Sequence, residues 1–91
     1  MPEVRGSFRI INKLGMHARA AAVFVQTASR FTAEILVSKG GAEVNGKSIM
    51  GILQLATLQG ETIEIIARGQ DGPEALDALE RLIQDRFGEE E

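Results

Sequence analysis

The chain has 91 residues, of which 44% are hydrophobic and 25% are charged, values typical of a globular domain rather than a disordered chain. It contains no cysteine and a single histidine, which excludes disulfide scaffolds, iron–sulfur clusters, thiol catalysis and the usual zinc sites. The net charge is −3, but residues 1–47 carry +4 and residues 48–91 carry −7. This asymmetry predicts that the first half meets anions or acidic partners, unless the acidic end of the chain merely skews the count.

The length and composition predict one domain over residues 1–91, with residues 88–91 forming a frayed acidic tail. The longest apolar run, residues 20–25, is far shorter than the roughly 20 residues of a membrane span, and the first residues lack a signal-peptide pattern. We therefore expect a cytoplasmic protein without a membrane segment. An acidic chain without Tyr or Trp does not predict nucleic-acid binding either.

The first half of the chain alternates between strand and helix patterns. Apolar residues at every second position predict a strand over residues 4–11, and turn-type residues follow it. Helical spacing of apolar residues then predicts an amphipathic helix over residues 18–29. Residues 33–38 alternate again, and the segment Lys-Gly-Gly at residues 39–41 predicts a hairpin turn into a short strand over residues 42–44.

The second half contains two more helices and one more strand. Ser48 is the predicted N-cap of a short helix, and residues 62–67 form the fourth predicted strand. Asp71, followed by an early Pro and a Glu three residues on, predicts the start of the longest helix, which ends near residues 87–88. The order β-α-β-β-α-β-α predicts a two-layer, open-faced α+β sandwich. Its four-stranded antiparallel sheet is covered on one face by three helices.

The single histidine, His17, directly precedes the first predicted helix. The first amide groups of a helix lack partners and its dipole is positive there, so an anion is stabilised at this place. Arg19 adds a guanidinium that can bind two phosphate oxygens. These residues could together let an imidazole accept and release a phosphoryl group. The alternative is a capping or exposed histidine beside an unrelated arginine. With no second His or Cys, no metal site is predicted.

Ser48 admits two interpretations, a helix cap or a site of regulatory phosphorylation. A phosphate on this serine would be stabilised by the helix N-terminus and by the neighbouring Lys47. Ile49 and Met50 are adjacent, so both cannot face the same core stripe. An exposed apolar pair of this kind is typical of a partner surface, and the alternative is a buried but irregular stripe.

Two segments resemble the HPr phosphocarriers of the bacterial phosphoenolpyruvate-dependent sugar phosphotransferase system. Residues 12–21, Asn-Lys-Leu-Gly-Met-His-Ala-Arg-Ala-Ala, are similar to the active-site signature of that family. Residues 46–53, Gly-Lys-Ser-Ile-Met-Gly-Ile-Leu, are similar to its regulatory-serine segment. The resemblance covers essentially the whole chain, including the order of the elements and the separation of the two motifs.

The resemblance implies a monomeric carrier that is not an enzyme and needs no cofactor. His17 would accept a phosphoryl group on Nδ1 from phosphorylated enzyme I and donate it to enzyme IIA domains, while Arg19 stabilises the phosphoryl oxygens. Ser48 would be phosphorylated by HPr kinase/phosphorylase. The implied docking surface for these partners consists of Met16, Ala18, Arg19, Ala20, Lys47, Ile49, Met50 and Leu53.

The sequence departs from the family pattern at Ala20, where a proline usually follows the active-site arginine. We expect this change to lower the free energy of unfolding by about 1 kcal/mol or less and to leave phosphoryl transfer intact. Two alternatives stay open at this point. One is a carrier of the paralogous nitrogen-related branch, which uses a different enzyme I and is not expected to need the Ser48 segment. The other is a small α+β ligand-binding regulatory module in which His17 is incidental.

Overall fold

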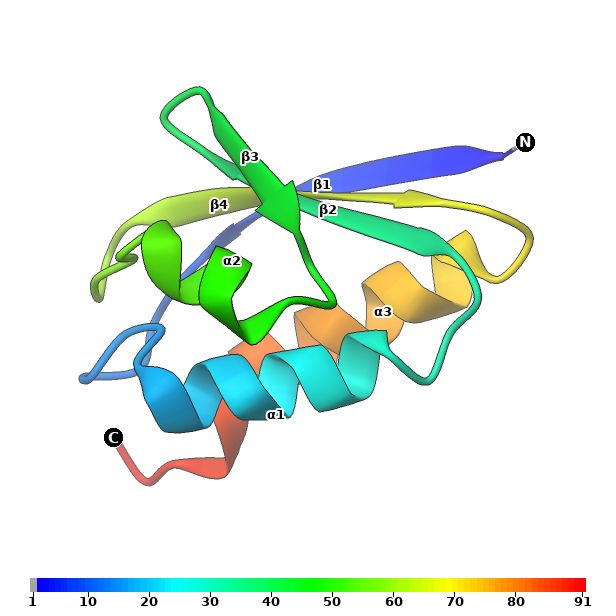
Figure 1. The fold of residues 1–91 in the computed structure, drawn as a ribbon. Helices are drawn as coiled ribbons and strands as arrows, with labels where there is room; N and C mark the ends of the chain where they lie inside the picture. The colour runs from blue at the N-terminus through cyan, green and yellow to red at the C-terminus, as the bar shows by residue number, and fades with distance from the viewer. Residues whose placement is uncertain (1) are drawn as a thin grey trace.

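The computed structural model describes residues 2–91, which form a four-stranded sheet with three α-helices on one of its faces (Figure 1). All neighbouring strands are antiparallel, in the order β1-β4-β2-β3. The predicted open-faced α+β sandwich and its order of elements are therefore confirmed. The elements are β1 (Glu3–Arg9), α1 (Ala18–Ala28), β2 (Glu34–Lys39), β3 (Ala42–Asn45), α2 (Ile49–Gln54), β4 (Thr62–Arg68) and α3 (Gly72–Gln84).

The alternation of residues in the strands decides which face of the sheet the helices cover. In β1 every second side chain is partly buried and the others are exposed. In the central strand β4, Ile63 and Ile65 are 1% and 0% exposed, and they lie opposite Phe8 of β1 and Val37 of β2. The apolar face of the sheet is thereby continuous across three strands, and it needs a helical layer to exclude water.

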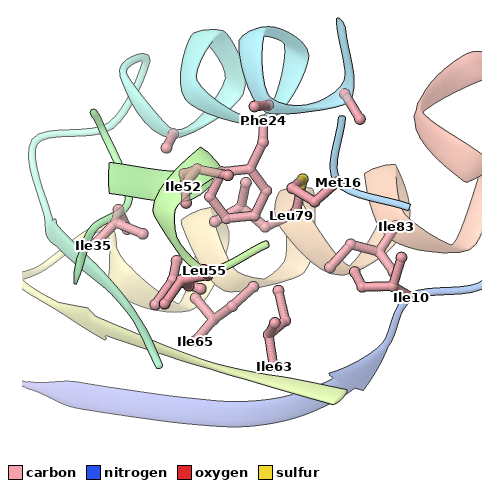
Figure 2. Close-up of a cluster of buried hydrophobic side chains, with 14 of the residues drawn as sticks. Ile10, Met16, Phe24, Ile35, Ile52, Leu55, Ile63, Ile65, Leu79 and Ile83 are labelled. Carbon is pink, nitrogen blue, oxygen red and sulfur yellow. The ribbon is translucent and has the colours of Figure 1, made fainter. Parts of the chain in front are cut away.

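The helices supply that layer through one shared core. Phe24 points from α1 into the cluster, close to Ile52 of α2 and Leu79 of α3 (Figure 2). All three side chains are at most 1% exposed. Burying a side chain of this size stabilises the fold by roughly 1.5–3 kcal/mol. The helix that follows the histidine is therefore held by the shared core and packs against α2 and α3.

The hairpin between β2 and β3 has the predicted turn. Gly40 and Gly41 both have positive φ angles, +57° and +87°. A two-residue turn with two such angles matches the twist of the strands, and glycine adopts it without strain. The prediction of a hairpin at this place is confirmed.

The predicted cap of the third helix is only half right. Asp71 occupies the N-cap position of α3, but its carboxylate makes no bond to the helix. It accepts hydrogen bonds from the backbone N–H groups of Thr32 and Ala33 at 2.9 and 2.8 Å. The bond from Thr32, assisted by that from Ala33, holds the pKa of Asp71 below its usual value against the opposing effect of burial. Asp71 therefore joins two loops that are far apart in the sequence.

The C-terminal end differs from the expectation. The last α-helix ends at Gln84, and a single 3₁₀ turn over Arg86–Gly88 follows. Phe87 is 3% exposed with a φ of +54°, so it anchors a sharp turn to the core. The chain then returns toward the start of α1, where the backbone oxygen of Glu91 accepts a hydrogen bond from the N–H of Lys13 at 2.6 Å. Residues 88–91 were expected to fray; in the structure Glu89 contacts Asn12 and His17, and Glu91 contacts Lys13.

Among residues 2–91, no helix has the length and apolarity that a membrane crossing requires.

Candidate functional site

His17 is the N-cap residue of α1. Its backbone is extended, with φ −77° and ψ −179°, and its side chain makes no capping bond. The first backbone hydrogen bond at this end of the helix runs from the N–H of Ala21 to the carbonyl of His17, at 2.8 Å. The amide groups of residues 18–20 therefore precede the helical ladder, and the first turn has no acidic residue. The positive end of α1 is available to an anion beside the ring.

The loop before His17 is fixed to the segment after α2. Gly15 has a φ of +67°, and a Cβ atom there would lie 2.6 Å from the backbone oxygen of Thr57. The N–H of Met16 donates to that same oxygen at 2.9 Å, and the Met16 side chain is buried. Only glycine allows so close an approach with this backbone angle. The loop consequently presents the imidazole from a defined position.

The ring of His17 contacts the C-terminal tail. Its Nε2 atom lies 2.5 Å from Oε2 of Glu89, while Oε1 of the same carboxylate accepts a hydrogen bond from Nδ2 of Asn12 at 2.9 Å. The side chains of His17 and Glu89 are 29% and 11% exposed. Burial alone would raise the pKa of Glu89, but the hydrogen bonds from Asn12 and His17, together with the positive charge of Arg19, hold it below its usual value. Glu89 is therefore ionised near neutral pH.

Arg19 is exposed on the first turn of α1, two residues after the histidine. Lys13, Leu14, His17, Arg19 and Glu89 all line one open pocket between the loop and the tail. The pocket combines an imidazole, two cationic side chains and a helix N-terminus, the groups that hold phosphate oxygens in proteins. It also contains a carboxylate already bonded to the ring.

Ser48 caps α2 as predicted. Its Oγ atom accepts a hydrogen bond from the N–H of Gly51 at 3.1 Å, and the residue is partly exposed. The neighbouring Lys47 is also partly exposed, and its Nζ atom donates to the carbonyl of Phe31 at 2.7 Å. The ammonium group expected at the edge of the docking surface is thus already bonded to the segment after α1.

The residues expected at the docking surface range from exposed to fully buried. Ile49 and Met50 are 42% and 69% exposed, so the adjacent apolar pair does lie at the surface. Leu53 is partly buried and packs against the core. Met16 and Ala20 are 4% and 0% exposed, which contradicts a direct role in docking, since their side chains fill the space under α1. The exposed members of the expected set are Ala18, Arg19, Ile49 and Met50.

Sequence reasoning missed four residues near the site. Asn12 is fully buried and Glu89 comes from the tail, and no periodic pattern marks either one. Leu14 and Leu58 are large apolar side chains that are 64% and 65% exposed. The two leucines are close in the fold, because Gly15 packs on the backbone of residues 57–58. A large apolar residue among turn-type residues is the sequence signal that could have marked Leu14 as a candidate surface residue.

Within residues 2–91, no three His, Cys, Asp or Glu side chains are grouped so that they could hold a metal ion.

Fold and site together define a small α+β protein with a single, partly exposed imidazole at the N-terminus of a helix. A family model described as the PTS HPr component phosphorylation site matches residues 4–85. The phosphocarrier protein HPr of Neisseria meningitidis is 51% identical over 88 residues, which cover 97% of this chain and 99% of that protein. The chain therefore belongs to the HPr family of phosphocarriers of the phosphotransferase system.

Solved structures agree with this assignment. The crystal structure of HPr-C-His from Thermoanaerobacter tengcongensis has a TM-score of 0.91 and 50% identity, with all of both chains covered. The crystal structure of Bacillus subtilis Crh, described as a dimer with a swapped domain, has a TM-score of 0.74 and 42% identity over 91% of this chain and 95% of that one. The fold is thus shared with HPr and with Crh.

Proposed function

We propose that His17 accepts a phosphoryl group from phosphorylated enzyme I and passes it to enzyme IIA domains. The observation that carries this proposal is the place of the ring, which is partly exposed at the N-terminus of α1, with Arg19 in the first turn of that helix. The free amides and the guanidinium can hold the three phosphoryl oxygens while the ring attacks the phosphorus. His17 would form a phosphohistidine intermediate, so the protein acts as a carrier and not as an enzyme, and it uses no cofactor.

The Nδ1 atom is the proposed acceptor on the ring. Its support is the contact between Nε2 and Glu89, which leaves Nδ1 as the nitrogen that faces away from the carboxylate. During transfer the bond from phosphorus to Nδ1 forms while the bond from phosphorus to the donor breaks. Arg19 would stabilise the oxygens in both in-line transfers, because its planar fork binds two of them at once.

Incubation with phosphoenolpyruvate, enzyme I and Mg²⁺ tests the proposal. We expect an adduct of ~80 Da on His17, the mass of one phosphoryl group replacing a proton. The adduct should be labile in acid and stable in base. His17→Ala should stay unmodified under the same conditions, and full phosphorylation of that variant would refute the assignment. Arg19→Ala should keep the modification but acquire it more slowly.

We also propose that HPr kinase/phosphorylase phosphorylates Ser48. The serine lies at the N-terminus of α2, directly before the exposed pair Ile49 and Met50. A dianion there would disturb a partner surface by like-charge repulsion and by solvating the apolar contact, so transfer from enzyme I should become slower. The test compares transfer to the unmodified and the kinase-treated protein, with Ser48→Ala as the unmodifiable control. Equal rates would refute this mechanism.

The proposed docking surface combines Ala18 and Arg19 of α1 with Lys47, Ile49 and Met50. Leu53 is partly buried and packs between this surface and the core. The contact between α1 and α2 supports a single surface built from residues of both helices. Exposed apolar side chains beside a polar reacting group are typical of surfaces that bind several partners in turn.

We further propose that the chain is a monomeric, cytoplasmic carrier with one domain over residues 1–91. The core formed by the sheet and all three helices supports a folded monomer. A dimer, the form described for Crh of Bacillus subtilis, is the alternative for the assembly. Light scattering coupled to size-exclusion chromatography distinguishes the two forms, and a stable species of twice the monomer mass would refute the monomer.

A further inference from the structure

The carboxylate of Glu89 makes two bonds that together fix where it points. Oε1 accepts from Nδ2 of Asn12 at 2.9 Å, and Oε2 contacts Nε2 of His17 at 2.5 Å. The Glu89 side chain is 11% exposed, so it is shielded more than an ordinary glutamate of a chain terminus. A shielded, two-point contact in a tail is a specific arrangement rather than a loose surface contact.

Asn12 is the fixed end of this arrangement. It is 0% exposed, and its Nδ2 group donates to the backbone oxygen of Gly15 at 2.8 Å as well as to Glu89. Its two donor hydrogens are therefore divided between the loop that presents His17 and the carboxylate. A buried amide with one hydrogen committed to the loop cannot turn freely, so it aims Glu89 at the ring.

The contact determines which ring nitrogen carries the hydrogen. An ionised carboxylate only accepts hydrogen bonds, so Nε2 of His17 must be the donor to Oε2. A neutral imidazole has one hydrogen, which leaves the lone pair on Nδ1. In metal sites and catalytic triads, a partner of this kind sets the tautomer and the orientation of the histidine.

We propose that Glu89 is a positioning residue for His17: it holds the ring in the Nε2–H tautomer with Nδ1 directed to the phosphoryl donor, and Asn12 aligns Glu89. This inference rests on the proposed phosphoryl transfer. As the bond from phosphorus to Nδ1 forms, the donor keeps the electron pair of the bond that breaks. The hydrogen on Nε2 stays in place. The ring acquires positive charge in that step, and the adjacent carboxylate stabilises it.

A matched set of three variants of the full chain tests the inference. Glu89→Ala removes both the acceptor and the charge. Glu89→Gln keeps an acceptor oxygen but removes the charge. Glu90→Ala is the control. Glu90 is exposed, and its replacement changes the net charge by the same amount as Glu89→Ala does. The variants lie at the end of the chain, outside the shared core, so their folding should be unaffected.

The first measurement is the ¹⁵N NMR shift of the two ring nitrogens, which reports the tautomer directly. Wild type and Glu90→Ala should show the hydrogen on Nε2. Glu89→Ala should show a mixture of tautomers, and Glu89→Gln should restore the Nε2–H form. A merely structural role of Glu89 would not produce this order of variants.

The second measurement is the rate of transfer from phosphorylated enzyme I. Glu89→Ala should be slower than wild type by about 10-fold, the effect of losing a partner that orients a histidine, and Glu89→Gln should lie between them. An unchanged tautomer, an unchanged rate or a faster rate in Glu89→Ala overturns the inference, and a faster rate would mean that the tail obstructs the site. If wild-type His17 is never phosphorylated, the proposed function fails instead, while the NMR result still decides whether Glu89 fixes the ring.

Discussion

The side-chain amide of Asn12, in the loop before α1, is buried although only one of its two polar atoms has a partner. Both hydrogens of Asn12 Nδ2 are bonded, but its Oδ1 atom is buried and has no partner within residues 2–91. An unsatisfied buried oxygen destabilises a fold by roughly 1–3 kcal/mol. The two hydrogen bonds that Nδ2 donates explain why an asparagine with an unsatisfied Oδ1 occupies this fully buried position. Asn12 is there for its donors, which connect the loop to the tail.

The lowered pKa of Glu89 predicts how the tail responds to acid. In the unfolded chain this carboxyl has its usual value of 4.5, and in the folded chain its value is lower. The folded state therefore binds this proton less readily than the unfolded state. The contact of the tail with the site contributes its full stability at a pH above the pKa of Glu89 in the unfolded chain. That contribution is lost as the pH falls through the pKa of Glu89 in the folded chain.

The N–H of Lys13 is a probe of tail docking, because it donates to the backbone oxygen of Glu91. Its protection factor against hydrogen exchange should be constant from pH 7 to about pH 5 and should decrease in more acidic solution. In Glu89→Ala the protection should be low throughout this range. Protection that already decreases between pH 7 and 6 would contradict the assignment of the effect to this carboxyl.

Ala20 allows a second test at the scale of one residue. Its N–H lies in the first turn of α1, before the first helical bond, so a proline there removes no hydrogen bond. Ala20→Pro should raise the free energy of unfolding by about 0.4–1 kcal/mol, because proline restricts the unfolded chain.

Ala21→Pro is the matched control for this prediction. Ala21 is equally buried, but its N–H donates to the carbonyl of His17 at 2.8 Å, so proline should lower the free energy of unfolding by about 3 kcal/mol. Urea denaturation measures both values. A similar loss in the two variants would show that steric crowding, and not the missing bond, decides the outcome at position 20.

At the scale of elements, the sequence contains the information for each helix and strand but little about what joins them. The alternation in β1 and the apolar stripe of α3 are local, and the structure confirms both. Asp71 looked like a cap because its neighbours follow the capping pattern, yet its carboxylate bonds to residues 32 and 33. A bond across 38 residues leaves no periodic signal in the sequence.

The site shows the same division. His17 and its position at the start of a helix follow from the local pattern, and so does the cap by Ser48. Glu89 could not be predicted, because a run of three glutamates after the last helix is typical of a solvated tail. Only the buried Phe87 and its turn direct those residues back to the site.

The cap of α2 gives a prediction at this scale. Ser48→Ala removes the acceptor for the N–H of Gly51 and should lower the free energy of unfolding by about 1 kcal/mol. Ser48→Asp should retain most of the stability, since aspartate caps helices as well as serine does. Urea denaturation of the three proteins measures these differences. A Ser48→Ala variant as stable as wild type would mean that the cap does not hold this short helix.

At the scale of the whole molecule, the fold changes the meaning of the charge distribution. The sequence separates a basic first half from an acidic second half. In space, Glu89 contacts His17, and the carboxylate of Glu91 lies 3.3 Å from Nζ of Lys13. The acidic tail therefore neutralises part of the positive charge around the site. A charge count by halves of the chain overstates the attraction of the site for anions.

The fold also separates the residues that hold it together from those at its proposed docking surface. Phe24 is fully buried in the common core, whereas Met50 is 69% exposed beside the site helix. Phe24→Ala should lower the free energy of unfolding by about 3–5 kcal/mol. That is a large share of the roughly 5–14 kcal/mol expected for a chain of this length. Met50→Ala should change it by less than about 0.5 kcal/mol.

Transfer from phosphorylated enzyme I should respond in the opposite order. Met50→Ala should lower kcat/KM by about 10-fold, because an exposed apolar side chain at the centre of a docking surface contributes more than 1 kcal/mol to binding. Phe24→Ala, assayed at a temperature where it remains folded, should transfer at a rate close to wild type, since its side chain touches no partner. Urea denaturation and the transfer assay on the same two preparations check both halves of the prediction. If Met50→Ala transfers normally, the exposed apolar pair is not part of the surface that enzyme I binds, and the docking surface must lie elsewhere around the ring.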